Sequence, residues 1–214
     1  MTFAERIKQG EFVVTCEIVP GRGTAGPPVD AAQTFAKRAI EEQLPIHTIS
    51  ITDNPGGSRA ISPDVIAREV LETGLPPLVH FSCRDLNRNA IESRASALSR
   101  CGIHNLLIIT GDNPESAAEG RARGVFDMDS IQTIRYLKDM NAGEVPGRKP
   151  KTTEKIPPTS FFLGAAVSPF KSREEELVPQ FIKLEKKIKA GADFIIPQLG
   201  YDMRKFHEIM RYLK

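Results

Sequence analysis

Apolar runs and helical stretches alternate six times along this chain, and this alternation constrains the fold more than any other feature of the sequence. The apolar runs are typical of strands and occupy residues 12–20, 46–53, 77–83, 105–112, 160–169 and 193–202. Segments with helical spacing follow them, near residues 30–43, 62–73, 87–100, 127–141, 172–190 and 203–214. Strict alternation favours a parallel sheet with right-handed helical crossovers. The sequence therefore predicts an α/β fold.

Local signals mark several helix ends. Asp30 is the predicted N-cap of the first of these helices, because its short carboxylate can accept a backbone hydrogen bond. Ser172 with Glu175 fits a capping box at the start of a later helix, and Pro179 is expected to kink that helix.

Two connections are longer than is usual in α/β proteins. Residues 113–126 follow a strand end and could form an active-site lid. Residues 142–159 follow a helix and are basic and rich in proline, so we expect a surface excursion.

Polar side chains of one parity recur on five of the strands. Successive side chains of a strand point to opposite faces, so these residues share one face of the sheet. On the fourth strand, Thr110 and Asp112 are placed opposite Ile109. In an open sheet this face would be covered by helices, whereas in a (β/α)₈ barrel it lines the axis and the site lies at the C-terminal mouth. The pattern predicts a TIM (β/α)₈-type barrel, with inner polar residues Thr15, Glu17, Thr48, Ser50, Thr52, His80, Ser82, Thr110, Asp112 and Gln198.

A G-x-G-x-x-G motif at residues 21–26 follows the first strand and offers an alternative, a dinucleotide-binding turn. Such a turn needs the helix to begin inside the motif, facing the pyrophosphate. Here Pro27 and Pro28 follow the last glycine, and the predicted N-cap lies beyond them. We therefore favour Glu17, at the end of the strand, as the residue that matters.

Composition excludes several classes of function. The net charge of +2 gives no drive toward nucleic acid, and no apolar run reaches the length of a membrane span. The 3 cysteines are widely spaced, without C-x-x-C, so no metal site is predicted. We expect a cytoplasmic protein that binds neither nucleic acid nor membranes.

Four large polar side chains at strand ends need a cavity or a ligand. Glu17 and Asp112 are carboxylates on different strands aimed at one mouth, so one could act as general acid while the other stabilises a cation. His80 either contacts a ligand or is hydrogen-bonded inside the barrel. Gln198 can read the amide edge of a heterocycle.

Seven blocks in order resemble the methylenetetrahydrofolate reductase family, most closely the branch fused to, or working beside, methyltransferases. The blocks are TCEIVP (15–20), SITD (50–53), HFSCRDLN (80–87), IITGD (108–112), GVFDMDSI (124–131), KKIKAGADF (186–194) and PQLGYD (197–202). The resemblance implies a flavin-containing TIM barrel. It also implies that electrons pass from NADH or NADPH through FAD to 5,10-methylenetetrahydrofolate, giving 5-methyltetrahydrofolate.

The resemblance assigns roles to particular residues. It implies that Glu17 is the general acid that opens the folate ring to an iminium ion, that Asp112 stabilises the cation near flavin and folate, and that Gln198 binds folate. Gln180 stands where many members have an acid for the cofactor's ribose, and Pro197 where they have threonine. The implied cofactor-binding residues are Thr52, Asp53, His80, Thr110, Gly111, Asp112, Phe126, Asp127, Ala165 and Lys187.

The family's barrel has eight βα units, and this chain holds the first six. We expect residues 1–214 to form a single barrel domain that is incomplete at its C-terminus. Two alternatives stay open: a non-catalytic flavin- or folate-binding subunit, and a reductase fed electrons by a partner protein. We expect a homo-oligomer or a subunit of a methyl-transfer complex.

Overall fold

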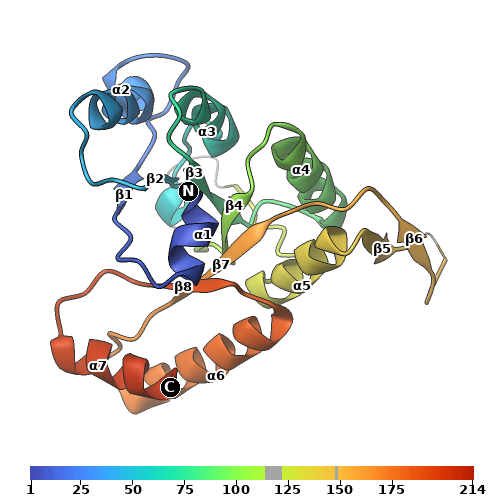
Figure 1. Cartoon of the computed structure of the whole chain (residues 1–214). Helices are drawn as coiled ribbons and strands as arrows, with labels where there is room; N and C mark the ends of the chain where they lie inside the picture. Colours follow the sequence, from blue (N-terminus) through green and yellow to red (C-terminus); the bar gives the residue numbers. More distant parts are fainter. Residues whose placement is uncertain (114–121, 148) are drawn as a thin grey trace.

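Six parallel strands form the sheet at the centre of the computed structural model, which describes residues 1–113, 122–147 and 149–214 (Figure 1). The strand order is β1-β2-β3-β4-β7-β8, so consecutive strands of this sheet are also neighbours in space. The strands are β1 (Thr15–Ile18), β2 (Thr48–Ile51), β3 (Pro77–Ser82), β4 (Asn105–Ile109), β7 (Phe162–Val167) and β8 (Phe194–Pro197). The predicted α/β fold is confirmed.

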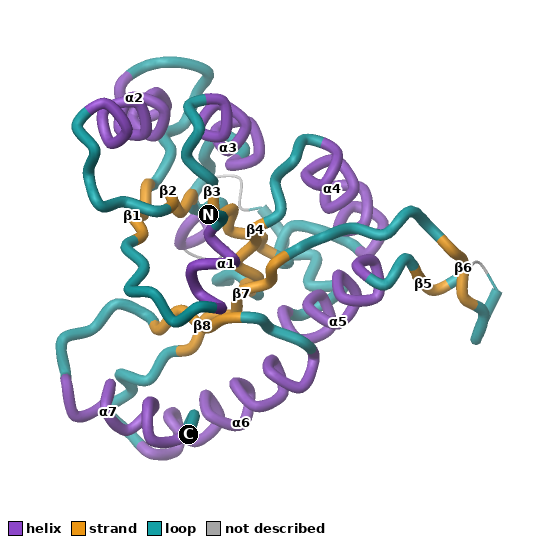
Figure 2. Tube along the Cα trace, in the orientation of Figure 1, coloured by secondary structure: helices purple, strands orange, loops and turns teal. Residues whose placement is uncertain are grey.

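A helix follows each strand and packs on the outer face of the curled sheet (Figure 2). Among the described residues, β1 and β8 pair on one side only, so the sheet is a half-barrel with two open edges. The arrangement is that of a partial TIM barrel, as predicted. The helices are α2 (Pro27–Glu41), α3 (Pro63–Glu72), α4 (Arg88–Arg100), α5 (Ser130–Asn141), α6 (Glu174–Ala190) and α7 (Met203–Tyr212).

Two apolar clusters hold the sheet from opposite faces. The larger one joins the outward residues of the strands, such as Ile49 and Phe81, to the helices. The smaller one lies on the inner face, where Phe3 contacts Phe162 and Phe194 edge-on at ring distances of 6.0 and 5.4 Å. Phe3 belongs to α1 (Phe3–Lys8), a helix that the sequence analysis did not predict. Helix α1 thus packs its apolar side chains against the apolar part of the inner face.

Two helices begin differently from the prediction. Gly26 is the N-cap of α2, and Asp30 accepts a hydrogen bond from the Gly26 N–H from inside the first turn, 3.1 Å away. The assignment of Asp30 as N-cap was wrong because Pro27 starts the helix, as proline can where no N–H is needed. Helix α6 has Arg173 as N-cap without a side-chain hydrogen bond, so the capping box at Ser172 was also wrong.

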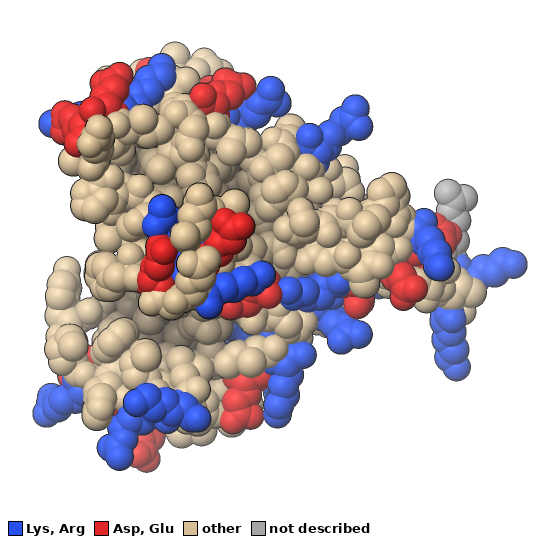
Figure 3. Space-filling view, in the orientation of Figure 1, with Lys and Arg blue, Asp and Glu red and all other residues tan. Residues whose placement is uncertain are grey.

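The long connection 142–159 is a surface excursion, as expected, but it is ordered into an antiparallel hairpin. Its strands are β5 (Glu144–Pro146) and β6 (Thr153–Lys155). The hairpin projects from the body, and Lys and Arg side chains reach out from it (Figure 3).

Residues 114–121 of the other long connection, the predicted lid, lie outside the described residues. Among the helices that the structure describes, none combines the length and the apolar character needed to cross a membrane.

Candidate active site

Glu17, Ser50 and His80 meet on the inner face of three neighbouring strands. Glu17 on β1 lies beside Ser50 on β2 in the parallel register. The Ser50 hydroxyl is 2.7 Å from Nε2 of His80 on β3, and the Glu17 carboxylate is 3.7 Å from the same nitrogen. The structure therefore brings together two of the large polar residues that the strand pattern placed at the mouth.

Burial shifts the pKa values of His80 and Glu17 in opposite directions. It lowers the pKa of His80 to about 4, although nearby Asp53 opposes the change. His80 is therefore neutral at pH 7, and its contact with Glu17 is not an ion pair. Partial burial raises the pKa of Glu17, whose side chain remains 61% exposed. A carboxyl whose pKa is raised and that still reaches solvent is suited to general-acid work.

Beside this pair, the polar face continues with two hydroxyls that have no partner among the described residues. Oγ1 of Thr52 and Oγ of Ser82 are both buried and unsatisfied. Gly111 adjoins Ser82 with φ +87°, and a Cβ there would lie 2.5 Å from Ser82 Oγ. Buried hydroxyls are normally hydrogen-bonded, so these point to a ligand that supplies polar atoms.

A groove of about 700 Å³ lies beyond the ends of β4, β7 and β8. Thr110, Gly111, Asp112, Lys187 and Gln198 all line it, so five of the predicted site residues meet there. Lys187 of α6 donates to the Ala166 carbonyl at 2.6 Å, and burial together with Lys183 lowers the pKa of Lys187. Further polar residues of the groove are Asp129, Ser130, Ser168, Lys171, Gln180 and Lys183.

The fourth strand differs from the prediction. Ile109 packs in the inner cluster, whereas the Thr110 hydroxyl donates to Ser130 Oγ at the start of α5, 3.1 Å away. Thr110 therefore lies opposite Ile109, as predicted, but it faces α5, so placing it on the inner face was wrong. Strand β4 ends at Ile109, and the positive φ of Gly111 interrupts the alternation on which the prediction relied.

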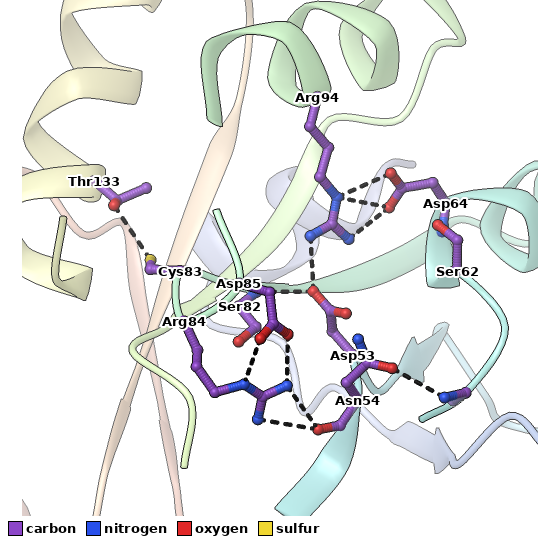
Figure 4. Close-up of polar contacts among 11 residues, drawn as sticks. Asp53, Asn54, Ser62, Asp64, Ser82, Cys83, Arg84, Asp85, Arg94 and Thr133 are labelled. Atoms are coloured by element: carbon purple, nitrogen blue, oxygen red, sulfur yellow. Dashed lines mark hydrogen bonds and ion pairs between the residues drawn. The ribbon is translucent and has the colours of Figure 1, made fainter. Parts of the chain in front are cut away.

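Asp53 lies in a buried ion network behind the site (Figure 4). One carboxylate oxygen accepts from the Ser82 N–H at 3.0 Å and from Arg94 at 2.7 Å. Arg94 also binds Asp64 and lies over the Phe81 ring. These contacts give Asp53 a structural role, and its cofactor role stays a prediction.

Three further predicted residues lie apart from the groove lining. Ala165 is fully buried between sheet and helices, and its neighbour Ala166 lines the groove instead. Asp127 accepts from the Arg88 N–H at the start of α4, 2.8 Å away. Phe126 has φ +44° and is 42% exposed.

Sequence analysis missed Arg84, which lies two residues beyond Ser82, the last residue of β3. Its side chain is 3% exposed and is held by polar groups of three loops at this end of the sheet. The signal was present, because a charged Arg-Asp pair after a buried strand cannot remain unpaired in the core.

The fold and the site define the class: a TIM-barrel-type α/β protein whose polar residues gather at the carboxyl ends of its strands. A sequence profile of the methylenetetrahydrofolate reductase family matches residues 2–214. The chain belongs to this family.

Two curated relatives are yeast proteins named methylenetetrahydrofolate reductase 2. The Schizosaccharomyces pombe protein is 22% identical over 220 residues, which span 98% of this chain and 31% of the relative. The Saccharomyces cerevisiae protein is 29% identical over 181 residues, which span 79% of this chain and 26% of the relative. The chain thus spans about a third or less of the length of these relatives.

Solved structures support the fold. An uncharacterized protein from Clostridium thermocellum that binds two copies of 5-methyl-5,6,7,8-tetrahydrofolic acid superposes with a TM-score of 0.64 at 14% identity, covering 97% of this chain and 62% of that one. A 2,3-dimethylmalate lyase of the PEP mutase/isocitrate lyase superfamily gives a TM-score of 0.59 at 11% identity, covering 100% and 68%. At these identities the likeness shows the fold alone.

Proposed function

We propose that this chain carries the active site of an FAD-dependent reductase that converts 5,10-methylenetetrahydrofolate to 5-methyltetrahydrofolate with NADH or NADPH as electron donor. The observation that carries the proposal is the Glu17–His80 pair, a carboxyl of raised pKa beside a neutral imidazole, in a member of this family. Folate as the substrate is also in keeping with what the Clostridium thermocellum neighbour binds.

Each polar residue has a chemical task in this proposal. The raised pKa of Glu17 favours its acid form, which donates a proton to the ring nitrogen that must become a leaving group. Neutral His80 adds no positive charge that would draw the proton away from Glu17. Asp112 supplies negative charge toward the cation that ring opening creates, and the Gln198 amide pairs with the pterin edge.

The residues present fit FAD. Thr52 and Ser82 offer unsatisfied hydroxyls to polar atoms of the cofactor, and Gly111 packs directly against Ser82. The groove supplies Lys187 and Lys183 for an anionic diphosphate. When bound, FAD would accept hydride from the nicotinamide and pass it to the folate.

The test is an anaerobic absorbance spectrum of the purified chain reconstituted with FAD, before and after NADH or NADPH. We expect the flavin band to bleach with the nicotinamide and to return when methylenetetrahydrofolate is added. A chain that binds no FAD under these conditions would contradict the proposal.

Two other outcomes identify the alternatives. Flavin that only a chemical reductant bleaches, and that folate reoxidises, would point to a partner protein as electron donor. Flavin that is bound but never reoxidised by folate would point to a binding subunit without reductase activity.

A further inference from the structure

Arg84 lies at the centre of the loops that follow β2, β3 and β4 (Figure 4). Its Nε and Nη2 atoms donate to both oxygens of the Asp85 carboxylate, at 2.9 and 2.6 Å. Nη1 and Nη2 donate to the Asn54 carbonyl, each at 3.3 Å. Nη1 also donates to the Asp112 carbonyl at 3.2 Å. One guanidinium therefore ties three strand ends to one another.

The backbone of Arg84 adds a fourth attachment. Its carbonyl oxygen accepts from the N–H of Val125 at 2.7 Å and of Phe126 at 3.1 Å. This segment leads into α5, whose first residue, Ser130, lines the groove. Arg84 therefore contacts both the loop after β4, through Asp112, and the segment that leads into α5, through Val125 and Phe126.

The Gly111 peptide rests directly on the Arg84 side chain. A Cβ at Gly111 would lie 2.8 Å from the Arg84 Cβ, which leaves no space between them. The next residue is Asp112, whose carbonyl accepts a hydrogen bond from Arg84 and which is one of the residues that line the groove. Gly111 and the Asp112 carbonyl both rest against Arg84. We therefore expect Arg84 to fix the backbone from which the Asp112 side chain extends.

We propose that Arg84 is a positioning residue: by holding the backbone carbonyl of Asp112, it aims the Asp112 carboxylate into the groove. The inference deepens the proposed function and rests on it for the catalytic role of Asp112. The Asp85 carboxylate pairs with Arg84 through two hydrogen bonds, so the guanidinium charge is compensated without engaging the carboxylate of Asp112. Lysine cannot replace this arginine, because three acceptors in different directions need the planar fork.

The first experiment needs neither flavin nor folate. Hydrogen exchange is measured by mass spectrometry on the cofactor-free chain and on Arg84→Met, which keeps a long apolar stem. Losing hydrogen bonds from a charged donor should speed exchange in segments 53–57 and 108–113 by roughly tenfold to a hundredfold. Arg84→Lys should show most of the same increase.

Arg94→Met is the matched control. Arg94 is another buried arginine at this end of the sheet, but its partners are Asp53 and Asp64 rather than Asp112. Its loss should speed exchange near α3 and leave segment 108–113 as in the unsubstituted chain. Unchanged exchange of 108–113 in Arg84→Met, or an equal increase in both variants, would overturn the proposal.

A double-mutant cycle then tests the link to activity. Asp112→Asn and Arg84→Met should each slow reoxidation of reduced flavin by folate. If Arg84 acts through Asp112, the double variant should be slower than Asp112→Asn by no more than about twofold. Losses that multiply would show that Arg84 acts by another route. If the unsubstituted chain fails to turn over folate, the proposed function fails, while hydrogen exchange still decides whether Arg84 positions Asp112.

Discussion

At the scale of single residues, the site depends on His80 and Glu17, two neighbouring groups whose pKa values burial shifts in opposite directions. His80 is buried enough that its imidazole stays neutral through the physiological range, with a pKa of about 4. Glu17, 3.7 Å away, is raised in pKa yet largely open to solvent. Of the two groups, Glu17 is therefore the one that takes up a proton first as the pH falls, in keeping with its proposed role as the acid.

Glu17→Gln should separate the two half-reactions. The amide keeps the shape of the side chain and has no acidic proton, so reoxidation of flavin by folate should slow by roughly 10²–10⁴-fold. Flavin reduction by NADH or NADPH should be unchanged, since it needs no general acid. Stopped-flow absorbance measures both steps. Glu42→Gln, at the exposed C-cap of α2, is the control and should leave both rates unchanged. Equal loss of both half-reactions in Glu17→Gln would count against the assigned role.

His80 should make the free energy of unfolding depend on pH. An unfolded histidine takes up a proton near pH 6.5, whereas folded His80 does so only near pH 4. Lowering the pH from 7 to 5 therefore favours the unfolded chain, by on the order of 1–2 kcal/mol. Urea unfolding of the chain and of His80→Gln at both pH values measures this. Between pH 7 and pH 5, the free energy of unfolding of the unsubstituted chain should fall more than that of His80→Gln. Equal falls in the two proteins would refute the expectation.

At the scale of elements, all six strands of the main sheet were predictable, because buried parallel strands are short apolar runs separated by helical stretches. Helix α1 was not predictable, since six residues carry too little periodicity and its position depends on distant partners, Phe162 and Phe194. The face of Thr110 was mistaken because the inward residues of β4 are the apolar Leu107 and Ile109, so Thr110 falls on the side of α5. The adjacent Arg84–Asp85 pair was visible in the sequence, but the contacts of Arg84 with the carbonyls of Asn54 and Asp112 are not displayed by a sequence.

Gly111 tests how closely the β4 loop fits its neighbours. Alanine there must adopt φ +87° and place a methyl group against Ser82 and Arg84, so Gly111→Ala should destabilise the chain by roughly 1–3 kcal/mol and weaken FAD binding. Gly23→Ala is the matched control, with φ +115° and no atom within 4 Å. Gly23→Ala should lower the free energy of unfolding through backbone strain alone and leave the affinity for FAD unchanged. Thermal unfolding and FAD titration measure both effects, and equal FAD affinities would disprove the close fit.

At the scale of the whole molecule, the half-barrel exposes two sheet edges and apolar side chains beside them. Val19 follows β1 and is 57% exposed, while Leu199, Tyr201 and Met203 follow β8 and are 71–88% exposed. Unpaired strand edges with apolar surroundings readily pair with another chain. An oligomeric or complexed state stays a prediction.

We expect the purified chain to self-associate as its concentration rises, through these edges. Sedimentation velocity over a concentration series measures this. Leu199→Lys and Tyr201→Lys together should shift the chain toward monomer, whereas a lysine at Phe12, 90% exposed before β1, tests whether that edge contributes. Monomer at every concentration would refute the expectation.

The contact of Phe3 with Phe194 has a consequence for how the chain reaches this structure. The first helix cannot complete the burial of its aromatic ring until β8 has formed, because its ring partners Phe162 and Phe194 lie far along the sequence. Closing so long a loop is slow and comes late. During synthesis, helix α1 should therefore stay incompletely docked until the residues of β8 have left the ribosome, so the inner apolar cluster closes only after the strands of this sheet have formed.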